Sequence, residues 1–560
     1  MQKHVYITSE VCRKAKINHV VVSPGSRSAP LTLAFASDVH FTCHSAADER
    51  SAAYMALGMA RQLQQPVVLI CTSGTAALNY FPAIAEAFFQ QVPLLILTAD
   101  RPPELLHQQD GQMIVQKNVY GNHVLASFEM PCYAHGKENL KQTASIVTQA
   151  IFKANNPLRK GPVHINVPLT EPLYEPIKKR AAHVELPTLV YPKIKDAQIS
   201  ADIKKRWQNS SRILVLAGSM EPDTVLFTAL RELGKLPQVV VLTDLLSNQH
   251  ATATVNCFDF LLSHASKDLL HNLRPDFIIS FGGPVLSKAL KLWLQEQKPR
   301  THIRIQTHEP TVNTYQNVTH TIFTKAPTYL LALSKIAGAK KVNTIWKNLW
   351  QQTAEISLIH INRFVNNDKN NELGITHTIL QHLPDAIDLH MANSSVIRYV
   401  SLLGTYQQSW IMHGNRGTSG IDGCSSTAVG AAMVNNRPTV LITGDLAFLY
   451  DSHAWWIDEI PDNIRVVVIN NGGGGIFSLI PGPHINKKQT RFFTTPHKQN
   501  IEQITLQYGM EYYFCRDLSS LEQMLNRFFD PRGKAAVLEI KTSMKDNAKA
   551  FEAFRKIKLP

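Results

Sequence analysis

The chain has 560 residues, which is too long for one hydrophobic core and predicts about three domains of ordinary size. Its hydrophobic fraction of 44%, with 27 glycines and 30 prolines, is typical of a globular enzyme and excludes a disordered or fibrous protein. The net charge of +14 comes from dispersed lysines and arginines without zinc spacing, an aromatic RNA-binding signature or a basic tail, so we expect no nucleic-acid partner.

The first block of the chain alternates apolar strands with helices. Strands with almost no polar alternation indicate a parallel, doubly wound sheet that is buried on both faces. The helix over 48–63 is amphipathic, because Ala53, Ala56, Leu57 and Ala60 share one stripe. In chain order we expect a strand from His19, a helix over 28–36, a strand over 41–44, the helix over 48–63, a strand in PVVLICTSG, a helix over 75–90, and strands in PLLILTAD and GPVHINVP.

Two more α/β blocks follow. The second contains RILVLAGS, a helix around 223–233, QVVVLTDLL, DFIISFGG, a helix over 285–295 and THIRIQTHE. The third contains LPDAIDLHMANSS, PTVLITGD, IRVVVINN and AAVLEIKT, and it repeats the topology that we expect for the first block. We therefore predict an α/β protein of three doubly wound parallel-sheet domains at 1–180, 195–340 and 341–560, with a linker around 175–195.

The cellular setting is indicated by the cysteines and by the absence of long apolar runs. Seven scattered cysteines without a C-x-x-C pair are typical of reduced core thiols. No apolar run approaches the length that spans a bilayer, and the opening MQKHVYITSE lacks a stretch suited to export. We expect a cytoplasmic protein without a membrane partner.

Two strand ends in the third block carry oxygen ligands. Asp445 ends one expected strand and Asn471 follows the next, 26 positions later. Parallel strands place such ends side by side, where open α/β sheets bind ligands. Asp445, the Asn471 amide oxygen and a backbone carbonyl form a hard oxygen set that suits Mg²⁺ shared with phosphates. The pattern resembles the diphosphate-metal motif of thiamine-diphosphate enzymes, although a glycine-rich turn with a capping Asp is the structural alternative.

A glutamate far upstream fits the other half of such a cofactor site. Glu49 lies in HSAADER at the first turn of a helix, where acidic residues are also favoured by the helix dipole alone. In thiamine-diphosphate enzymes a glutamate bonded to the pyrimidine nitrogen favours the tautomer that deprotonates the cofactor, which itself supplies the carbanion chemistry. Glu49 and the Asp445–Asn471 pair together predict thiamine diphosphate with Mg²⁺, or alternatively Mn²⁺, as cofactors.

Longer segments of the sequence resemble one particular family of thiamine-diphosphate enzymes. SPGSRSAPLTLA, DERSAAYMALGMAR, TSGTAALNYFPAIAEA, LTADRPPEL, NRGTSGIDG, GDLAFLYD and GGIFSLIP resemble those of the 2-succinyl-5-enolpyruvyl-6-hydroxy-3-cyclohexene-1-carboxylate synthase (MenD) family of menaquinone biosynthesis. The similarity is weaker in the middle block. It implies decarboxylation of 2-oxoglutarate, 1,4-addition of the resulting succinyl carbanion equivalent to isochorismate, and a homodimer or homotetramer with sites between chains.

The resemblance also implies roles for particular residues. Both substrates are dianions, and the planar fork of arginine suits carboxylates. The implied catalytic residues are Glu49, Arg27, Gln112 and Arg398. The implied substrate residues are Ser26, Arg27, Arg101, Gln112, Lys288, Ser394, Arg398, Arg416, Phe477 and Ile480. The implied cofactor residues are Glu49, Asn393, Ser394, Ile421, Gly444, Asp445, Leu446, Asn471 and Ile476, and the metal ligands are Asp445, Asn471 and the Gly473 carbonyl.

Departures from the family and competing interpretations remain open. Ala289 stands where relatives can carry an arginine beside Lys288, and the metal run reads NNGGGG where some relatives have a third Asn and a Gln. An ordinary ion pair for Arg398, a polar loop role for Gln112 and a core role for Ile421 are the structural alternatives. The functional alternatives are another thiamine-diphosphate decarboxylase or carboligase, similar to acetohydroxyacid synthase, and a non-catalytic cofactor-binding protein.

Overall fold

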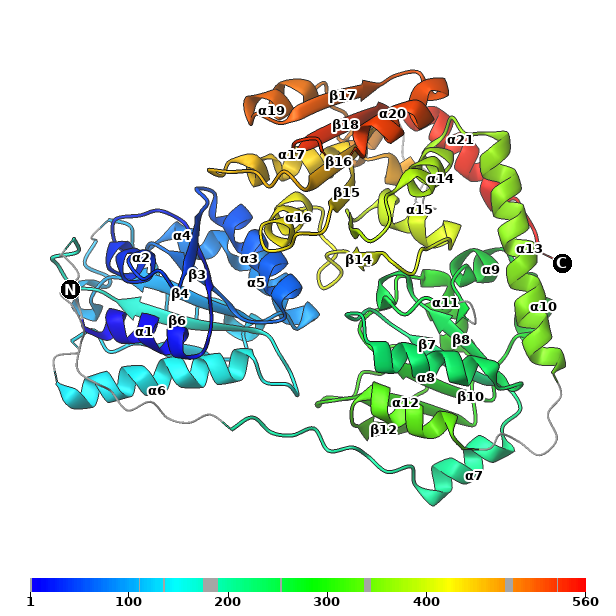
Figure 1. Cartoon of the computed structure of the whole chain (residues 1–560), viewed down its shortest axis with the longest axis horizontal. Coiled ribbons are helices and arrows are strands. Elements are labelled where there is room, and N and C mark those ends of the chain that lie inside the picture. The colour runs from blue at the N-terminus through cyan, green and yellow to red at the C-terminus, as the bar shows by residue number, and fades with distance from the viewer. Residues whose placement is uncertain are drawn as a thin grey trace. The chain divides into compact units, whose positions relative to one another are not determined.

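The computed structural model of the chain describes residues 3–109, 111–133, 136–174, 190–251, 254–336, 344–478, 487–530 and 532–559. Within these residues the chain forms three six-stranded sheets, one in each expected block (Figure 1). The molecule consists of two compact units. The first unit holds Met1–Lys193, Asn415–Thr439 and Ala447–Ile464, and the second holds Ile194–Gly414, Val440–Leu446 and Arg465–Pro560. The α/β class with three parallel doubly wound sheets is confirmed, whereas the three domain ranges stay predictions.

The first sheet has the strand order β2-β1-β3-β4-β6-β5, and its neighbouring strands are parallel. Helices α1, α2 and α6 share one apolar cluster with the strands, and α3 contacts β1 and β3 without joining that cluster, so α3 covers the other face. The strands are β1 (His19–Val22), β2 (Thr42–Ser45), β3 (Val67–Cys71), β4 (Leu94–Asp100), β5 (Ser127–Glu129) and β6 (Pro162–Pro168). The helices of the first unit are α1 (Lys3–Lys14), α2 (Ala29–Ala36), α3 (Glu49–Leu63), α4 (Thr75–Asn79), α5 (Phe81–Gln90), α6 (Lys137–Ala154) and α16 (Cys424–Ala432).

The other two sheets belong to the second unit. The middle sheet has the order β12-β11-β10-β7-β8-β9, the arrangement of dinucleotide-binding folds. The third sheet has the order β14-β13-β15-β16-β18-β17, which repeats the first sheet and confirms the expected shared topology. Their strands are β7 (Ile213–Ala217), β8 (Val239–Thr243), β9 (Thr254–Val255), β10 (Phe277–Phe281), β11 (Thr301–Gln306), β12 (His320–Phe323), β13 (Asp388–Met391), β14 (Ile411–His413), β15 (Thr439–Gly444), β16 (Ile464–Asn470), β17 (Glu511–Cys515) and β18 (Ala536–Lys541).

One continuous apolar cluster joins the middle and third sheets. Leu214 and Leu242 of the middle sheet belong to the same buried cluster as Leu389 and Ile442 of the third sheet. This shared core explains why both sheets fall in one unit. The remaining α-helices of the described residues are α7 (Ala201–Asn209), α8 (Thr224–Lys235), α9 (Phe258–His264), α10 (Lys267–Asn272), α11 (Lys288–Glu296), α12 (Ala326–Ser334), α13 (Ile345–Asn367), α14 (Glu372–His382), α15 (Ser395–Leu403), α17 (Asp445–Tyr450), α18 (Lys487–Thr494), α19 (Ile501–Gln507), α20 (Leu521–Phe528) and α21 (Met544–Arg555).

Two helix predictions need correction. The helix expected over 75–90 is two helices, α4 and α5, because Pro82 lies at the start of α5 and has no N–H for a bond to the preceding turn. The helix expected over 285–295 begins only at Lys288, where the Ser287 side chain accepts a hydrogen bond from the backbone N–H of Leu290 and caps it.

All seven cysteines are free thiols, and five of them are buried. Among the described residues, no helix combines the length and apolar character that a bilayer-spanning segment needs.

Helices α3 and α16 pack at backbone distance through a reciprocal pair of glycines. A Cβ added to Gly58 of α3 would lie 2.0 Å from the carbonyl oxygen of Thr427, and one added to Gly430 of α16 would lie 2.1 Å from that of Met55. No side chain fits at either place, so the two glycines permit the close approach. The contact fixes α3, whose first residue is Glu49.

We predict that Gly58→Ala and Gly430→Ala each lower the free energy of unfolding by about 1–3 kcal/mol, because the new methyl group forces two helix backbones apart. Gly136→Ala is the matched control, since Gly136 has open space around its Cβ position and an ordinary φ of −95°. Denaturant unfolding of the purified variants measures the effect. Equal stability of all three variants would contradict the close packing.

Candidate functional site

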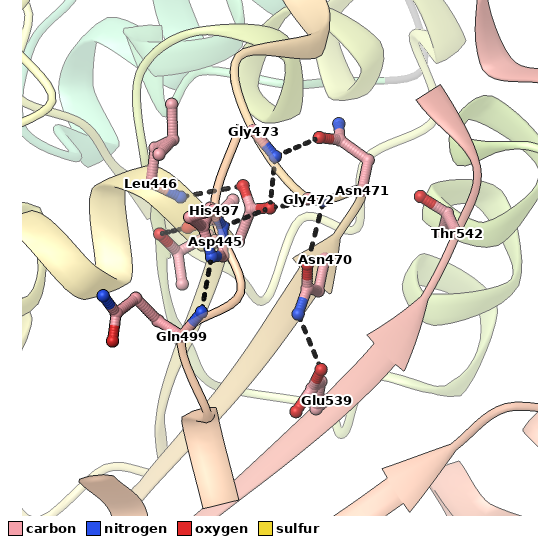
Figure 2. A network of polar contacts seen from close by, with 12 residues as sticks. Asp445, Leu446, Asn470, Asn471, Gly472, Gly473, His497, Gln499, Glu539 and Thr542 are labelled. Carbon is pink, nitrogen blue, oxygen red and sulfur yellow. Dashed lines mark hydrogen bonds and ion pairs between the residues drawn. The ribbon is translucent and has the colours of Figure 1, made fainter. Parts of the chain in front are cut away.

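In the second unit, Asp445 is buried at the carboxyl end of β15 and is surrounded by N–H donors (Figure 2). Its Oδ1 accepts a hydrogen bond from the backbone N–H of Leu446 at 2.8 Å. Its Oδ2 accepts from the N–H groups of Gly472 and Gly473, at 2.7 and 2.9 Å. A buried carboxylate is stable only when its charge is compensated, and these donors compensate it.

His497 also contacts Asp445, with its Nε2 3.1 Å from Oδ2. The backbone N–H of Gln499 donates to the Nδ1 of His497, so the ring proton lies on Nε2 and points at the carboxylate (Figure 2). His497 lies 52 positions beyond Asp445 and was absent from the residues expected in the site. Its sequence signal, a lone histidine in a loop, is too weak to have indicated this contact.

Asn471 follows β16 and faces the same backbone donor as Asp445. The N–H of Gly473 lies 3.1 Å from the Asn471 Oδ1 and 2.9 Å from the Asp445 Oδ2. Gly473 has a φ of 154°, and a Cβ there would lie 2.4 Å from the carbonyl oxygen of Thr494. Glycine is therefore required at position 473, and the turn directs the Asp445 carboxylate and the Asn471 amide oxygen toward one N–H donor at the ends of two neighbouring strands.

The Asn471 amide nitrogen contacts a second buried carboxylate, that of Glu372 at the start of α14. The Nδ2 of Asn471 donates to the Glu372 Oε1 at 2.6 Å. Burial raises the pKa of Glu372; the hydrogen bonds from Asn471 and Tyr399 work against that shift, and the charge of Asp445 adds to it. Glu372 was also absent from the expected site residues.

A cavity of about 170 Å³ in the same unit collects several residues expected to bind substrate or cofactor. Arg398, Lys288 and Ile476 line it, and so does Ala289, the position at which the resemblance implies that an arginine can stand. The Arg398 side chain donates to the carbonyl oxygen of Ser394. The cavity thus brings together residues of the middle and third blocks, including the positively charged side chains of Lys288 and Arg398.

Asp259 is the acid of this cavity. Burial raises its pKa, whereas hydrogen bonds from Ser287 and Ser401 and the positive charge of Arg398 work against that shift. The Asp259 carboxylate therefore has two hydroxyl partners in addition to the charge of Arg398. Arg398 thus has two possible roles: an electrostatic contact with Asp259, which is structural, and the binding of substrate.

Asn393 and Ser394 lie between β13 and α15, as expected for residues at a helix N-terminus. Asn393 is buried, and Ser394 has φ 84° and ψ −125° as the residue that precedes α15. Such a conformation is strained for a residue with a Cβ and is concentrated at functional sites. Gly444 and Leu446 flank Asp445, and Phe477 is 45% exposed beside Phe493. Ile480 lies outside the described residues.

In the first unit, Glu49 is the first residue of α3 and is half-buried. Asp48 caps the helix, since its side chain accepts a hydrogen bond from the N–H of Ser51, so Glu49 is not needed as the cap. The Glu49 Oε2 accepts a hydrogen bond from the Nδ2 of Asn79 at 3.2 Å. The carboxylate therefore remains available to a ligand at the start of the helix.

Arg27 and Arg101 follow strands β1 and β4. Arg27 donates to the carbonyl oxygen of Leu169 at 3.1 Å and pairs with Glu171 at 3.2 Å. Arg101 is buried and donates to the Ser73 hydroxyl at 2.8 Å and to the Gln112 carbonyl at 3.3 Å. The structure thus brings Arg101 and the backbone of Gln112 together, while the Ser26 and Gln112 side chains are exposed.

Arg416 and Ile421 lie in a loop over 415–423 that is held by the buried Glu86 of α5. The Glu86 carboxylate accepts hydrogen bonds from the N–H of Gly417 at 2.8 Å and from the N–H and hydroxyl of Thr418, at 2.6 and 2.5 Å. Arg416 and Ile421 are both partly exposed. Glu86 is separated from this loop by more than 300 positions, so no local pattern could have indicated the contact.

Comparison with known families agrees with this arrangement. Three family models match: the thiamine pyrophosphate enzyme N-terminal TPP binding domain at residues 5–119, the middle domain of thiamine pyrophosphate enzymes at 185–391, and the thiamine pyrophosphate enzyme C-terminal TPP binding domain at 394–540. The chain thus has the domains of a thiamine-diphosphate enzyme.

Curated relatives named 2-succinyl-5-enolpyruvyl-6-hydroxy-3-cyclohexene-1-carboxylate synthase match almost the full length. The protein of Flavobacterium johnsoniae is 36% identical over 96% of both chains, and that of Cytophaga hutchinsonii is 36% identical over 99% of this chain and 98% of its own. The protein of Desulfotalea psychrophila is 34% identical over 96% of this chain and 98% of its own. On this full-length similarity, the chain belongs to the 2-succinyl-5-enolpyruvyl-6-hydroxy-3-cyclohexene-1-carboxylate synthase family of thiamine-diphosphate enzymes.

Proposed function

We propose that this chain decarboxylates 2-oxoglutarate and adds the resulting four-carbon unit to isochorismate, releasing CO₂ and forming 2-succinyl-5-enolpyruvyl-6-hydroxy-3-cyclohexene-1-carboxylate. The observation that carries the proposal is the similarity to the named synthases over nearly the whole chain. This chain also carries Glu49, Asp445 and Asn471, the residues that the resemblance implies for the cofactor site. We place this activity in the cytoplasm, where the free thiols stay reduced.

We propose that Asp445, the Asn471 amide and the Gly473 carbonyl hold Mg²⁺, with Mn²⁺ as an alternative. The donor set fits, because all three are hard oxygen ligands and the metal shares its shell with phosphate oxygens. Asn393, Ser394 and the start of α15 would bind the diphosphate, and Gly444, Leu446, Ile421 and Ile476 would contact the rest of the cofactor. When bound, thiamine diphosphate supplies the carbanion chemistry.

In this proposal Glu49 would hold a proton at the pyrimidine nitrogen of the cofactor. Arg398 and Lys288, in their shared cavity, would bind a substrate carboxylate. Ser26, Arg27, Arg101, Gln112 and Arg416 would bind the other charged and polar groups of the two dianions, and Phe477 and Ile480 would form an apolar wall that excludes water.

We predict that Glu49→Gln lowers turnover by at least about 100-fold, the usual contribution of a positioned proton-transfer group, while the fold is retained. Glu138→Gln is the matched control, because Glu138 is an exposed glutamate in the first turn of α6. The assay contains thiamine diphosphate, Mg²⁺ and 2-oxoglutarate and follows the loss of isochorismate absorbance. Near-normal turnover by the Glu49 variant would contradict the assignment. Decarboxylation without consumption of isochorismate would favour a different carboligase or decarboxylase of this cofactor class.

We predict that Arg398→Ala reduces kcat/KM by about 10- to 100-fold, since a hydrogen bond from a charged group contributes about 1.5–3 kcal/mol. Arg206→Ala is the control, because Arg206 is also a helical arginine but forms an exposed pair with Asp202. Kinetics and melting temperature are measured together. If Arg398→Ala reduced stability as much as catalysis, Arg398 would serve mainly as the electrostatic partner of Asp259.

We also propose that the sites lie between chains of a homodimer or a dimer of dimers, since the pyrimidine and diphosphate residues come from different blocks. Two inactive variants, Glu49→Gln and Asp445→Ala, are mixed under conditions that exchange chains. Shared sites predict recovery of about a quarter of wild-type activity, because half of randomly mixed dimers carry one intact site. No recovery despite demonstrated exchange, or an active monomer in sedimentation, would contradict the proposal.

A further inference from the structure

The carboxylate of Glu372 lies behind Asn471 and is outside the motif that indicates the metal site. Glu372 is the first residue of α14 and is 3% exposed. Its Oε1 lies 2.6 Å from the Asn471 Nδ2, 2.8 Å from the Asn547 Nδ2 and 3.4 Å from the Thr542 hydroxyl. The loop after β16 and the turn from β18 into α21 thus meet at a single carboxylate oxygen of α14.

Backbone donors fix the direction of both amides that meet at Glu372. The N–H of Glu372 donates to the Asn547 Oδ1 at 3.0 Å, so the Nδ2 of Asn547 must be the atom that faces the carboxylate. The N–H of Gly473 likewise donates to the Asn471 Oδ1 at 3.1 Å, so the Asn471 Nδ2 faces the carboxylate. A backbone N–H cannot accept a hydrogen bond, and therefore neither amide can be turned over without losing two bonds.

The fixed amide places the Asn471 oxygen beside Asp445. The same N–H of Gly473 lies 2.9 Å from the Asp445 Oδ2 and 3.1 Å from the Asn471 Oδ1, so both oxygens face one donor. These are the two side-chain oxygens that the proposed function assigns to the cation. If Asn471 turned over, it would present an N–H₂ group, which cannot bind a cation.

We propose that Glu372 is a positioning residue for the divalent cation: by holding the Asn471 amide nitrogen, it keeps the amide oxygen directed toward Asp445. The inference rests on the proposed function, because it concerns the cation of that site. Residues that orient metal ligands without touching the metal usually change metal affinity by about 10- to 100-fold when removed.

The neighbouring Asn470 is also held between a buried glutamate and a backbone N–H, so it provides an internal control. Its Nδ2 donates to the Glu539 Oε1 at 2.7 Å, and its Oδ1 accepts from the N–H of Gly472 at 3.0 Å (Figure 2). Glu539 is 7% exposed and also accepts a hydrogen bond from the Tyr512 hydroxyl. Asn470 is not in the proposed donor set, so the two asparagine–glutamate pairs differ in whether the asparagine binds the cation.

The test compares Glu372→Met, Glu372→Gln and Glu539→Met in the full-length protein. Intrinsic tryptophan fluorescence follows the binding of thiamine diphosphate as Mg²⁺ is titrated, and electron paramagnetic resonance measures bound Mn²⁺. We expect Glu372→Met to raise the half-saturating cation concentration about 10- to 100-fold. Glu372→Gln keeps an acceptor oxygen, so its half-saturating cation concentration should stay within about threefold of the wild-type value. Glu539→Met should also stay within about threefold, because it loses stability but no metal contact.

Three results would overturn the inference. Unchanged cation affinity in Glu372→Met would show that Asn471 needs no such partner. An equal loss of cation affinity in Glu372→Gln would show that the charge of Glu372 supports cation binding, and not its hydrogen bond to Asn471. An equal loss in Glu539→Met would show that any damage at this strand end weakens the site. If the wild-type protein itself bound thiamine diphosphate without a cation, the proposed metal site would fail first.

A milder variant keeps the test informative if Glu372→Met does not fold. Asn547→Ala leaves the Glu372 carboxylate in place but removes its bonds to the Asn547 side chain. We expect a smaller rise in the half-saturating cation concentration, about threefold to tenfold. The melting temperature of the cofactor-free protein should fall less than in Glu372→Met, because Asn547→Ala removes only one of the buried partners of Glu372. Unchanged cation affinity in this variant, with Glu372→Met unfolded, would overturn the inference.

Discussion

The burial of the Asp445 carboxylate is the constraint on which the candidate site depends. A carboxylate at 1% exposure is costly unless donors or a cation compensate its charge. The loop after β16 provides those donors as the N–H groups of Gly472 and Gly473, which requires a backbone that only glycine adopts easily. The same turn brings the Asn471 oxygen beside Asp445. The need to compensate the buried charge of Asp445 thus accounts for the glycines at 472 and 473 and for the position of the Asn471 oxygen near this carboxylate.

Buried carboxylates lie beside three of the proposed site residues. Glu86 accepts hydrogen bonds from the loop that contains Arg416, Asp259 lies beside Arg398, and Glu372 holds Asn471. A buried acid with several donors loses much free energy if one partner moves, so such contacts hold a loop in one conformation. Glu86 thus holds the loop over 415–423, and Glu372 holds the Asn471 amide, each within its own unit.

Much of the secondary structure was predictable, because it depends on local patterns. Apolar runs indicated the buried strands β3 and β4, and the stripe along 48–63 indicated α3. The break between α4 and α5 was missed, since the helical pattern of 75–90 outweighed the signal of Pro82. The partners of the motif residues were also missed: Glu86 meets a loop 331 positions away, and Glu372 meets an asparagine 99 positions away.

The sequence alone determined the class of fold and the chemistry of the motif residues, because strand burial, helix periodicity and the oxygen ligands Asp445 and Asn471 are properties of short segments. Only the tertiary structure decided which way those ligands face. The direction of the Asn471 amide depends on a backbone N–H on one side and on Glu372 on the other. The close approach of α3 and α16 likewise depends on a glycine in each helix. Such contacts form only when distant segments pack, and no local pattern encodes them.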